Sequence, residues 1–388
     1  RPAGAAQSGA VRPLFWICAA LIAWAQAGYG LFLALLAKVR EIGETRPPGP
    51  PADADLPTVT VIVAAYQEAS VIADKVANLR ALDYPADKLE VIVACDGSPD
   101  DTAARARAAG ATRVLELPRG GKVRAQDAAV RAASGEIVAF SDANAFWAPD
   151  ALRQLVAPFG ADPAVGYVCG QVTFVNDDGG TNQEGLYWRY EMALRGFESR
   201  LASITAGNGA IYATRRAAYV EVDPIMGHDL MFPFTMVKRG WRAVYAPDAR
   251  ATERMVPTIE GEFARKRRMM THGWPIVLRG GMLSFRGYGP LYALMIASHR
   301  LLRYASPFLH AAVLATSVAL ARRGRPYAVA LAGQLLVLAA AALAPRVPLR
   351  PFLVARYYVL TTAALAAGLW DVARRPTEAG WEPPPGTR

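Results

Sequence analysis

The apolar residues of this chain crowd both of its ends, and the middle shows a different spacing. Residues 13–38 hold no charge before Lys38, and about 20 apolar residues are enough to cross a bilayer. Three further apolar runs of similar length lie in the last third of the chain. We therefore expect an N-terminal transmembrane anchor and a group of C-terminal transmembrane helices, the latter near residues 305–321, 327–344 and 352–371.

Between these runs, strand signals and helix signals alternate. Residues 58–64 form a continuous β-branched run, as a strand that is buried on both faces requires. Strands that alternate with helices through short connections predict an α/β fold, with a mostly parallel sheet flanked by helices. Further strands are expected at 89–94, 112–117 and 136–141, and helices at 70–82, 99–109 and 122–133.

Local composition places the boundaries between these regions. Residues 41–57 are rich in Pro, Gly and Asp, which is typical of a linker. Residues 292–304 carry His299, Arg300 and Arg303 among apolar residues, a pattern typical of an amphipathic helix in the membrane interface. The predicted organisation is an anchor (1–40), a linker (41–57), a cytosolic catalytic domain (58–285), an interfacial helix (286–304), transmembrane helices (305–372) and a tail (373–388).

The orientation of the membrane segments rests on where the positive charges lie. Lys38 and Arg40 follow the first segment and favour a cytosolic central domain, because positive loops stay inside. Arg322 and Arg325, between two later segments, would then lie outside, which opposes the same rule. Arg356, inside the last segment, either reaches back to the interface or faces a polar cavity between helices. We expect a multi-pass protein of the inner (plasma) membrane, with a secretory signal peptide as the alternative for the first segment.

Charge and composition narrow the class of partner. The net charge is +10 and 53% of the residues are hydrophobic. Such a basic chain either binds nucleic acid or lies on an anionic membrane and handles phosphorylated substrates. Its Arg and Lys residues flank apolar runs and form no stripe with stacking aromatic residues, so we expect a lipid bilayer and no nucleic acid as partner. Three Cys residues without CxxC and four His residues without metal-ligand spacing indicate neither a disulfide framework nor a zinc site.

Polar residues follow the predicted strands, and ligands of such sheets bind beyond the carboxyl ends of the strands. Asp96 ends the second strand, where it either binds a base or ribose or belongs to a turn whose Ser98 caps a helix. Asp142 and Asn144 end the fourth strand, where two oxygens can hold Mg²⁺ or Mn²⁺ together with phosphate oxygens. Lys122 follows two glycines at a helix start without a complete P-loop pattern, so it either attracts phosphate or is solvated.

Three later residues have two interpretations each. Asp229 precedes an apolar helix. Its side chain either caps this helix or acts as a base. Arg265 and Arg268 share one face of a predicted helix, where they either clamp a diphosphate or lie on the membrane surface. A dinucleotide-binding oxidoreductase is disfavoured, because no GxGxxG follows the first strand.

Taken in order, these motifs resemble the membrane-bound, inverting glycosyltransferases of family 2, which include cellulose, chitin, hyaluronan and poly-N-acetylglucosamine synthases. Each motif is weak alone, and their common order and spacing over about residues 57–310 are specific. The residues that carry the resemblance are Val61-Ile-Val-Ala-Ala-Tyr-Gln-Glu68, Leu82-Asp-Tyr-Pro85, Asp96-Gly-Ser98, Gly121-Lys122, Ser141-Asp-Ala-Asn144, Pro149-Asp-Ala-Leu152, Leu186-Tyr-Trp-Arg-Tyr-Glu191, Gly207-Asn-Gly-Ala-Ile-Tyr212, Asp229, the arginine cluster and His299-Arg-Leu-Leu-Arg303 with Ser306-Pro-Phe308.

The resemblance implies a GT-A fold and a nucleotide-sugar donor, expected to be linked to UDP. It implies inverting, metal-dependent transfer of a hexosyl or N-acetylhexosaminyl group to a glycan or a lipid-linked acceptor at the membrane. The implied site consists of nucleoside contacts at Glu68 and Asp96, donor contacts at Lys122, Arg265 and Arg268, a site for Mg²⁺ or Mn²⁺ at Asp142 and Asn144, and the catalytic base at Asp229.

The chain departs from the family pattern at three places. Asn144 replaces the second Asp of the DxD motif, and His228 stands where an acidic residue usually precedes the base. Met269 stands where polymerising members carry Trp, which weakens the prediction of processive synthesis. Trp188 and Trp274 are alternative platforms for the acceptor sugar, although ordinary packing is the favoured interpretation of both. The alternatives are therefore a polyprenyl-phosphate glycosyltransferase and a catalytically silent membrane scaffold that keeps the fold.

Overall fold

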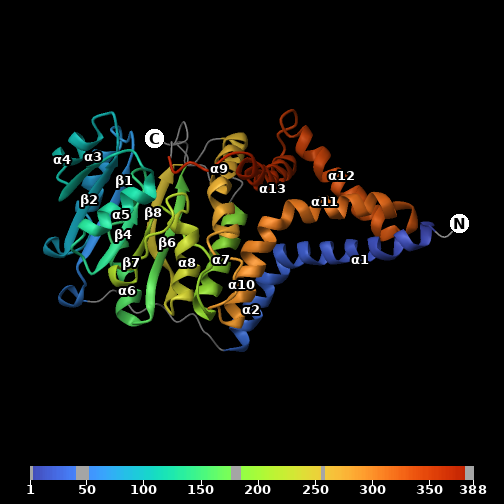
Figure 1. Ribbon diagram of the computed structural model, residues 1–388, viewed down its shortest axis with the longest axis horizontal. Helices are drawn as coiled ribbons and strands as arrows, with labels where there is room; N and C mark the ends of the chain where they lie inside the picture. Colours follow the sequence, from blue (N-terminus) through green and yellow to red (C-terminus); the bar gives the residue numbers. More distant parts are fainter. Residues whose placement is uncertain (1–2, 41–51, 176–184, 255–257, 381–388) are drawn as a thin grey trace. The chain divides into compact units, whose positions relative to one another are not determined.

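The computed structural model describes residues 3–40, 52–175, 185–254 and 258–380, which belong to two compact units (Figure 1). The sheet unit comprises Ala37–Val256, Pro275–Tyr292 and Pro376–Arg388. The helical unit comprises Arg1–Leu36, Pro257–Trp274 and Ala293–Arg375.

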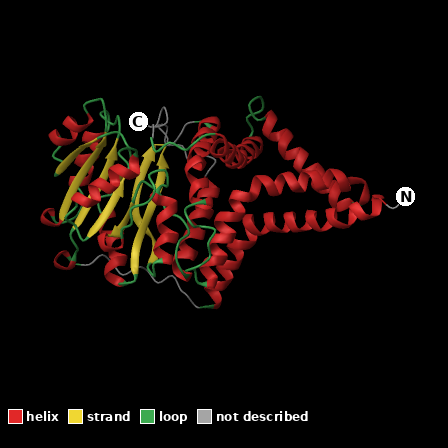
Figure 2. Cartoon of the chain, viewed as in Figure 1, coloured by secondary structure: helices red, strands yellow, loops and turns green. Residues whose placement is uncertain are grey.

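One mixed sheet of eight strands forms the frame of the sheet unit, in the order β3-β2-β1-β4-β7-β6-β8-β5 (Figure 2). The four strands expected from the sequence pair in parallel, β1 with β2 and β4, and β2 with β3. β7 pairs antiparallel with both β4 and β6, while β6 and β8 are parallel. The strands are β1 (Val59–Ala65), β2 (Leu89–Asp96), β3 (Arg113–Leu117), β4 (Ile137–Ser141), β5 (Phe146–Trp147), β6 (Val165–Val175), β7 (Tyr212–Arg215) and β8 (Arg242–Arg254).

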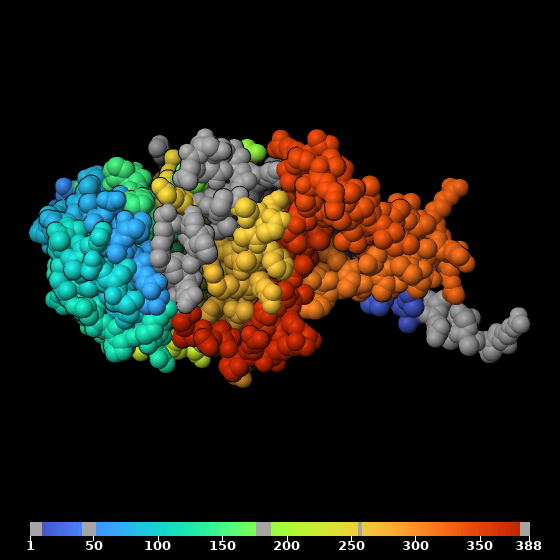
Figure 3. Space-filling view, turned by 90° about the horizontal axis from the view of Figure 1, so that it is seen from above, coloured from blue at the N-terminus to red at the C-terminus, as the bar shows by residue number. Residues whose placement is uncertain are grey.

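Helices cover both faces of this sheet, as the sequence predicted. Val61 and Val63 of β1 belong to a core with α3 and α6, whereas Ile62 between them belongs to a core with α5 and α8. The period of two in a strand that is buried on both sides accounts for this division. The light-blue and cyan residues of this unit form one continuous surface (Figure 3). The helices of this unit are α3 (Ile72–Arg80), α4 (Thr102–Ala108), α5 (Lys122–Ala132), α6 (Ala151–Ala161), α7 (Gly185–Leu201) and α8 (His228–Lys238).

The helical unit holds the apolar segments. Among the residues that the structure describes, four helices are long and apolar enough to cross a membrane by length and composition. The first contains α1 (Ala3–Ala23) and α2 (Tyr29–Val39), and Phe15 and Cys18 of α1 pack with Val313 and Tyr327 of later helices. The four candidate spans are Ala10–Val39, Pro290–Arg323, Arg325–Leu343 and Arg350–Arg374.

The boundary predicted at residue 304, between an interfacial helix and the C-terminal spans, falls inside one continuous helix. Helix α10 (Pro290–Met295) continues through a π-helical segment, Ile296–Leu301, into α11 (Leu302–Leu320). Pro307 lies within this helix without ending it, and a π-helical turn absorbs the local mismatch in backbone bonding. That the part around His299 lies in an interface stays a prediction.

Ion pairs join α9 (Ile259–Leu278) to α13 (Arg350–Arg374) within the helical unit. Arg356 donates to Glu260 at 2.6 and 2.9 Å, so this charged residue of the last segment has a carboxylate partner, which the sequence did not indicate. Arg267 forms a bidentate pair with Asp371 at 2.6 and 2.7 Å. Two paired charges of this kind stabilise one register of the two helices.

Candidate active site

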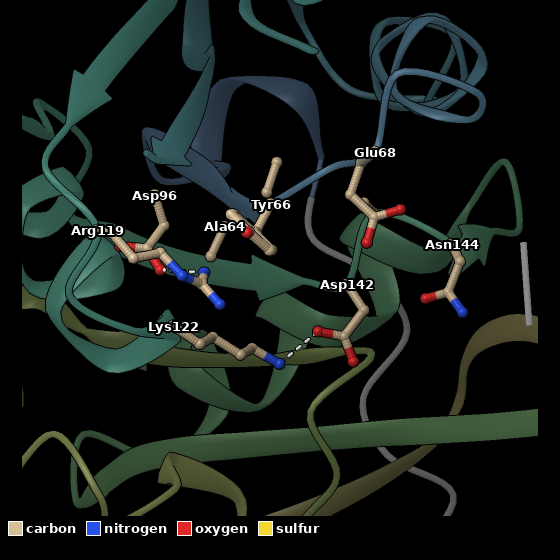
Figure 4. Close-up of a pocket in the computed structure, with 10 residues that line it drawn as sticks. Ala64, Tyr66, Glu68, Asp96, Arg119, Lys122, Asp142 and Asn144 are labelled. Atoms are coloured by element: carbon tan, nitrogen blue, oxygen red, sulfur yellow. Dashed lines mark hydrogen bonds and ion pairs between the residues drawn. The ribbon is translucent and has the colours of Figure 1, made fainter. Parts of the chain in front are cut away.

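A pocket opens at the carboxyl ends of β1, β2 and β4 (Figure 4). This is the edge of the sheet at which the sequence predicted ligand binding. Five of the predicted site residues, Glu68, Asp96, Lys122, Asp142 and Asn144, line it together. The complete lining is Ala64, Ala65, Tyr66, Glu68, Asp96, Arg119, Lys122, Asp142, Ala143 and Asn144.

Asp96 is buried and holds the loop before α5. Its carboxylate accepts hydrogen bonds from the backbone N–H groups of Gly120 at 2.6 Å and Gly121 at 2.9 Å, and from Arg119 at 2.7 Å. The two glycines therefore direct their amides at a protein carboxylate. This arrangement fixes the loop that delivers Lys122 to the pocket.

The turn after Asp96 requires glycine and differs from the expected helix start. Gly97 has φ +65°, and a Cβ there would lie 2.8 Å from the backbone nitrogen of Arg119, so only glycine fits. Ser98 caps no helix; its hydroxyl accepts the N–H of Gln67 at 2.9 Å. Helix α4 begins later, at Thr102, because Asp100 binds the hydroxyl of Thr102 and closes a local turn first.

Lys122 points into the pocket and pairs with Asp142 (Figure 4). Burial acts to lower the pKa of Lys122, and the carboxylates of Asp142, Asp229 and Glu253 raise it further than burial lowers it. The ammonium group therefore stays charged among several carboxylates. Lys122 is thus a partly exposed, paired cation in the pocket, and its binding of an anionic ligand stays a prediction.

Asp229 is not among the residues that line this pocket, but its carboxylate interacts electrostatically with both members of the pair. It occupies the first turn of α8, and its backbone carbonyl accepts the N–H of Gly207 at 2.7 Å. Two residues on, a Cβ at Gly209 would lie 3.3 Å from Lys122 Nζ and 3.4 Å from Asp142 Oδ2. Burial raises the pKa of Asp229, Lys122 lowers it and Asp142 raises it, with a net rise. Asp229 thus shares an electrostatic environment with Lys122 and Asp142.

Asp142 and Asn144 supply only some of the ligands that a divalent cation needs. Asn144 donates through Nδ2 to Glu253 at 3.3 Å, and its amide oxygen lies on the side facing Asp142 (Figure 4). Among the described residues no group of three His, Cys, Asp or Glu side chains could hold a metal. Mg²⁺ is usually held by one or two carboxylates together with substrate phosphates. The oxygens of Asp142 and Asn144 suit a cation that arrives with a diphosphate.

Tyr66 and Arg119 line the pocket and were missed by the sequence analysis. The Arg119 guanidinium lies 3.3 Å from the centroid of the Tyr66 ring, at cation–π distance. The same guanidinium donates to Asp96 at 2.7 Å, so the ring, the cation and the carboxylate form one group beside the pocket. The signal for Tyr66 was its place directly after β1; Arg119 looked like part of an ordinary loop, because only the fold brings it to Asp96.

Arg265 and Arg268 lie on α9, in its part that belongs to the helical unit. Arg265 donates to Glu262 at 2.7 Å through two nitrogens. The pocket described above is built by the sheet unit alone, so diphosphate binding by these two arginines stays a prediction.

The two tryptophans proposed as sugar platforms both have packing roles. Trp188 donates its indole N–H to the carbonyl of Val172 at 3.2 Å and packs edge-on against Phe174. Trp274 is buried and donates to the carbonyl of Leu365 at 2.9 Å. Packing, which the sequence already offered for both residues, explains their positions.

Comparison with known sequences identifies related proteins. The family described as "Glycosyltransferase like family 2" matches residues 57–272. An N-acetylglucosaminyltransferase of Mesorhizobium japonicum is 30% identical over 239 residues, which cover 56% of this chain and 56% of the relative. A poly-beta-1,6-N-acetyl-D-glucosamine synthase of Staphylococcus aureus is 25% identical over 252 residues, 62% of this chain and 61% of the relative. The chain thus spans little more than half the length of these curated relatives.

A solved structure resembles nearly the whole chain. It is a mannosyltransferase from Pyrobaculum calidifontis in complex with GDP-Man and Mn²⁺, with 28% identity and a TM-score of 0.71. The similarity covers 93% of this chain and 99% of that one. The GT-A type of fold expected from the sequence is therefore confirmed.

Proposed function

Because this chain belongs to glycosyltransferase family 2, we propose that it transfers a sugar, with inversion, from a nucleotide sugar to a glycan or lipid-linked acceptor at a membrane. The observation that carries the proposal is the ion pair of Lys122 with Asp142 in the pocket at the carboxyl ends of the strands, within electrostatic range of Asp229. A cation, a carboxylate for a metal and a carboxylate with a raised pKa are the groups that this reaction needs.

The donor occupies the pocket in this proposal. Tyr66 and Arg119 offer a wall for the flat base, and the buried carboxylates of Glu68 and Asp96 accept hydrogen bonds from the nucleoside. The diphosphate lies toward Lys122 and Asp142. The resemblance to a mannosyltransferase bound to GDP-Man and Mn²⁺ supports a nucleotide-sugar donor with a divalent cation. We propose a hexosyl or N-acetylhexosaminyl group as the sugar, in line with the names of the two curated relatives. UDP is proposed as the nucleotide carrier on the family resemblance alone.

The chemistry follows from the proposed positions. The acceptor hydroxyl gives its proton to the Asp229 carboxylate while its oxygen attacks the anomeric carbon, and the bond to the diphosphate breaks on the opposite face. Charge develops on the leaving diphosphate, which Lys122 stabilises from its paired position. Mg²⁺ or Mn²⁺, held by Asp142 and Asn144, would supply further charge stabilisation at the same oxygens. Arg265 and Arg268 are proposed as additional diphosphate ligands.

The raised pKa of Asp229 predicts a particular pH profile. The base must be ionised to accept a proton, so kcat/KM rises with pH and reaches a plateau above the pKa of this group. Burial raises that pKa, so the acid limb lies above the value of about 3.9 for an exposed Asp. Initial rates of nucleoside diphosphate release across pH measure this, with donor saturation checked at each pH. A limb at the pKa of an exposed carboxylate would contradict the assignment.

Membrane association is supported by several features of the chain. Four apolar helices are long enough to span a bilayer. Within Pro275–Tyr292 of the sheet unit, Leu283 and Phe285 are exposed beside Arg286 in a stretch without acidic residues, a combination suited to an anionic lipid surface. We propose a multi-pass protein of the inner membrane with a cytosolic sheet unit. We also propose that the acceptor is presented at that surface.

A screen of nucleotide sugars tests the proposed function. Detergent-purified full chain is incubated with each donor and Mn²⁺ or Mg²⁺ in the presence of membrane lipid extract, and released nucleoside diphosphate is measured. Release with one or a few donors is expected. Mass spectrometry of the product distinguishes an extended glycan from a sugar joined to a polyprenyl phosphate. Absence of release with every donor, together with absence of nucleotide binding, would leave the silent scaffold as the remaining explanation.

A further inference from the structure

A buried lysine lies directly behind the Asp142–Asn144 turn. Lys75 of α3 has no exposed surface, and its ammonium group donates to the backbone carbonyl of Ala145. Nζ also lies 5.2 Å from the centroid of the Trp147 ring. A buried ammonium group is costly unless it is paired and hydrogen-bonded, so a lysine here needs a reason beyond core packing.

A second side chain of α3, that of Asn78, binds the backbone of the same turn at Trp147. Asn78, one helical turn after Lys75, donates through Nδ2 to the carbonyl of Trp147 at 2.9 Å. Its Oδ1 accepts the N–H of Trp147, also at 2.9 Å. Two polar side chains of α3 therefore fix the backbone that follows Asp142 and Asn144 directly.

The ammonium group of Lys75 interacts electrostatically with Asp142 of the pocket. Burial lowers the pKa of Lys75 to about 7, and the carboxylate of Asp142 opposes this shift. Asp142 therefore interacts with Lys122 in the pocket and, from behind the turn, with the protonated form of Lys75. The pair at Lys122 is partly exposed, whereas Lys75 is completely buried.

We propose that Lys75, assisted by Asn78, is a positioning residue that holds the 142–147 turn so that the oxygens of Asp142 and Asn144 face one divalent cation. The inference rests on the metal site of the proposed function. Residues that orient metal ligands from behind commonly change metal affinity when they are replaced. Lys75 touches neither donor nor acceptor in this arrangement.

Replacement of Lys75 by methionine tests the proposal by cation binding instead of turnover. Methionine matches the length and apolar stem of lysine and removes the donor to Ala145. Isothermal titration of Mn²⁺ into the full chain at saturating UDP is expected to give a Kd raised about 10-fold or more. UDP affinity at saturating Mn²⁺ is expected to stay near the wild-type value. Asn78→Ala is also expected to raise the Kd for Mn²⁺. It replaces Lys75→Met as the test if that variant folds poorly.

Lys88→Met is the matched control. Lys88 also donates to backbone carbonyls, those of Asp53, Ala54 and Leu56 at 2.8 to 2.9 Å, and it lies at the end of β2 opposite to Asp96. The Lys88→Met substitution is expected to lower the unfolding temperature without changing the affinity for Mn²⁺. Unchanged Mn²⁺ binding in Lys75→Met would overturn the positioning role. Tighter Mn²⁺ binding would also overturn it, because it would indicate that the Lys75 ammonium group simply repels the cation. A wild type that binds UDP but no Mn²⁺ would refute the metal site itself and the inference with it.

Discussion

Asp229→Asn is expected to lower kcat by at least about 100-fold, because it removes the proposed general base while it keeps the size and hydrogen-bonding oxygen of the side chain. The neutral amide cannot accept the proton of the acceptor hydroxyl. Donor binding is expected to remain measurable, since the base lies on the acceptor side of the anomeric carbon. The loss should therefore appear in kcat much more than in the affinity for UDP.

The measurement pairs a turnover assay with titration of UDP in the presence of Mn²⁺. Asp223→Asn is the matched control, because Asp223 is exposed and lies six residues earlier, before α8, where it accepts the N–H of Ile225 at 3.1 Å. That variant should turn over like the wild type. Wild-type turnover in Asp229→Asn would refute the assignment of the base.

Asp142→Asn is expected to weaken the binding of a nucleotide with Mn²⁺ by about 10- to 100-fold, which is the usual scale for damage to a metal site. Two neutral amides would then face the cation, and Lys122 would lose its ion pair. The affinity for nucleotide without metal should fall less, because the contacts of Asp96 with the loop at Gly120 and Gly121 are untouched.

Titration of UDP with Mn²⁺ and with chelator measures this difference. Asp150→Asn is a suitable control, since Asp150 is an exposed carboxylate shortly after the turn, bonded to Gln154 at 3.3 Å. It should leave both affinities unchanged. An Asp142→Asn protein with full Mn²⁺-dependent affinity would place the cation elsewhere.

The first half of the sheet could be predicted because its signals are local. Each of the four expected strands matches an observed one within two residues at either end, for example 89–94 against Leu89–Asp96. A β-branched run that is buried on both faces has few other solutions. The meeting of Asp96 and Asp142 followed from the rule for parallel strands, without any side-chain information.

The second half of the sheet depends on contacts distant in sequence. β7 is four residues long and pairs antiparallel with β4 and β6, and no local pattern identifies so short a strand. Arg119 and Lys75 were missed for a similar reason. Both are cations whose partners, Asp96 and the carbonyl of Ala145, come from other elements. A buried charge looks like a solvated one until its surroundings are known.

The function of the pocket is tested most directly by equilibrium binding of nucleotides to the wild-type chain. UDP and GDP are titrated into detergent-purified protein with Mn²⁺ and, separately, with a chelator. At least one nucleotide is expected to bind with Mn²⁺ and to lose about 10-fold or more in affinity with the chelator. If neither nucleotide binds under either condition, the pocket at Asp96, Lys122 and Asp142 is not a donor site.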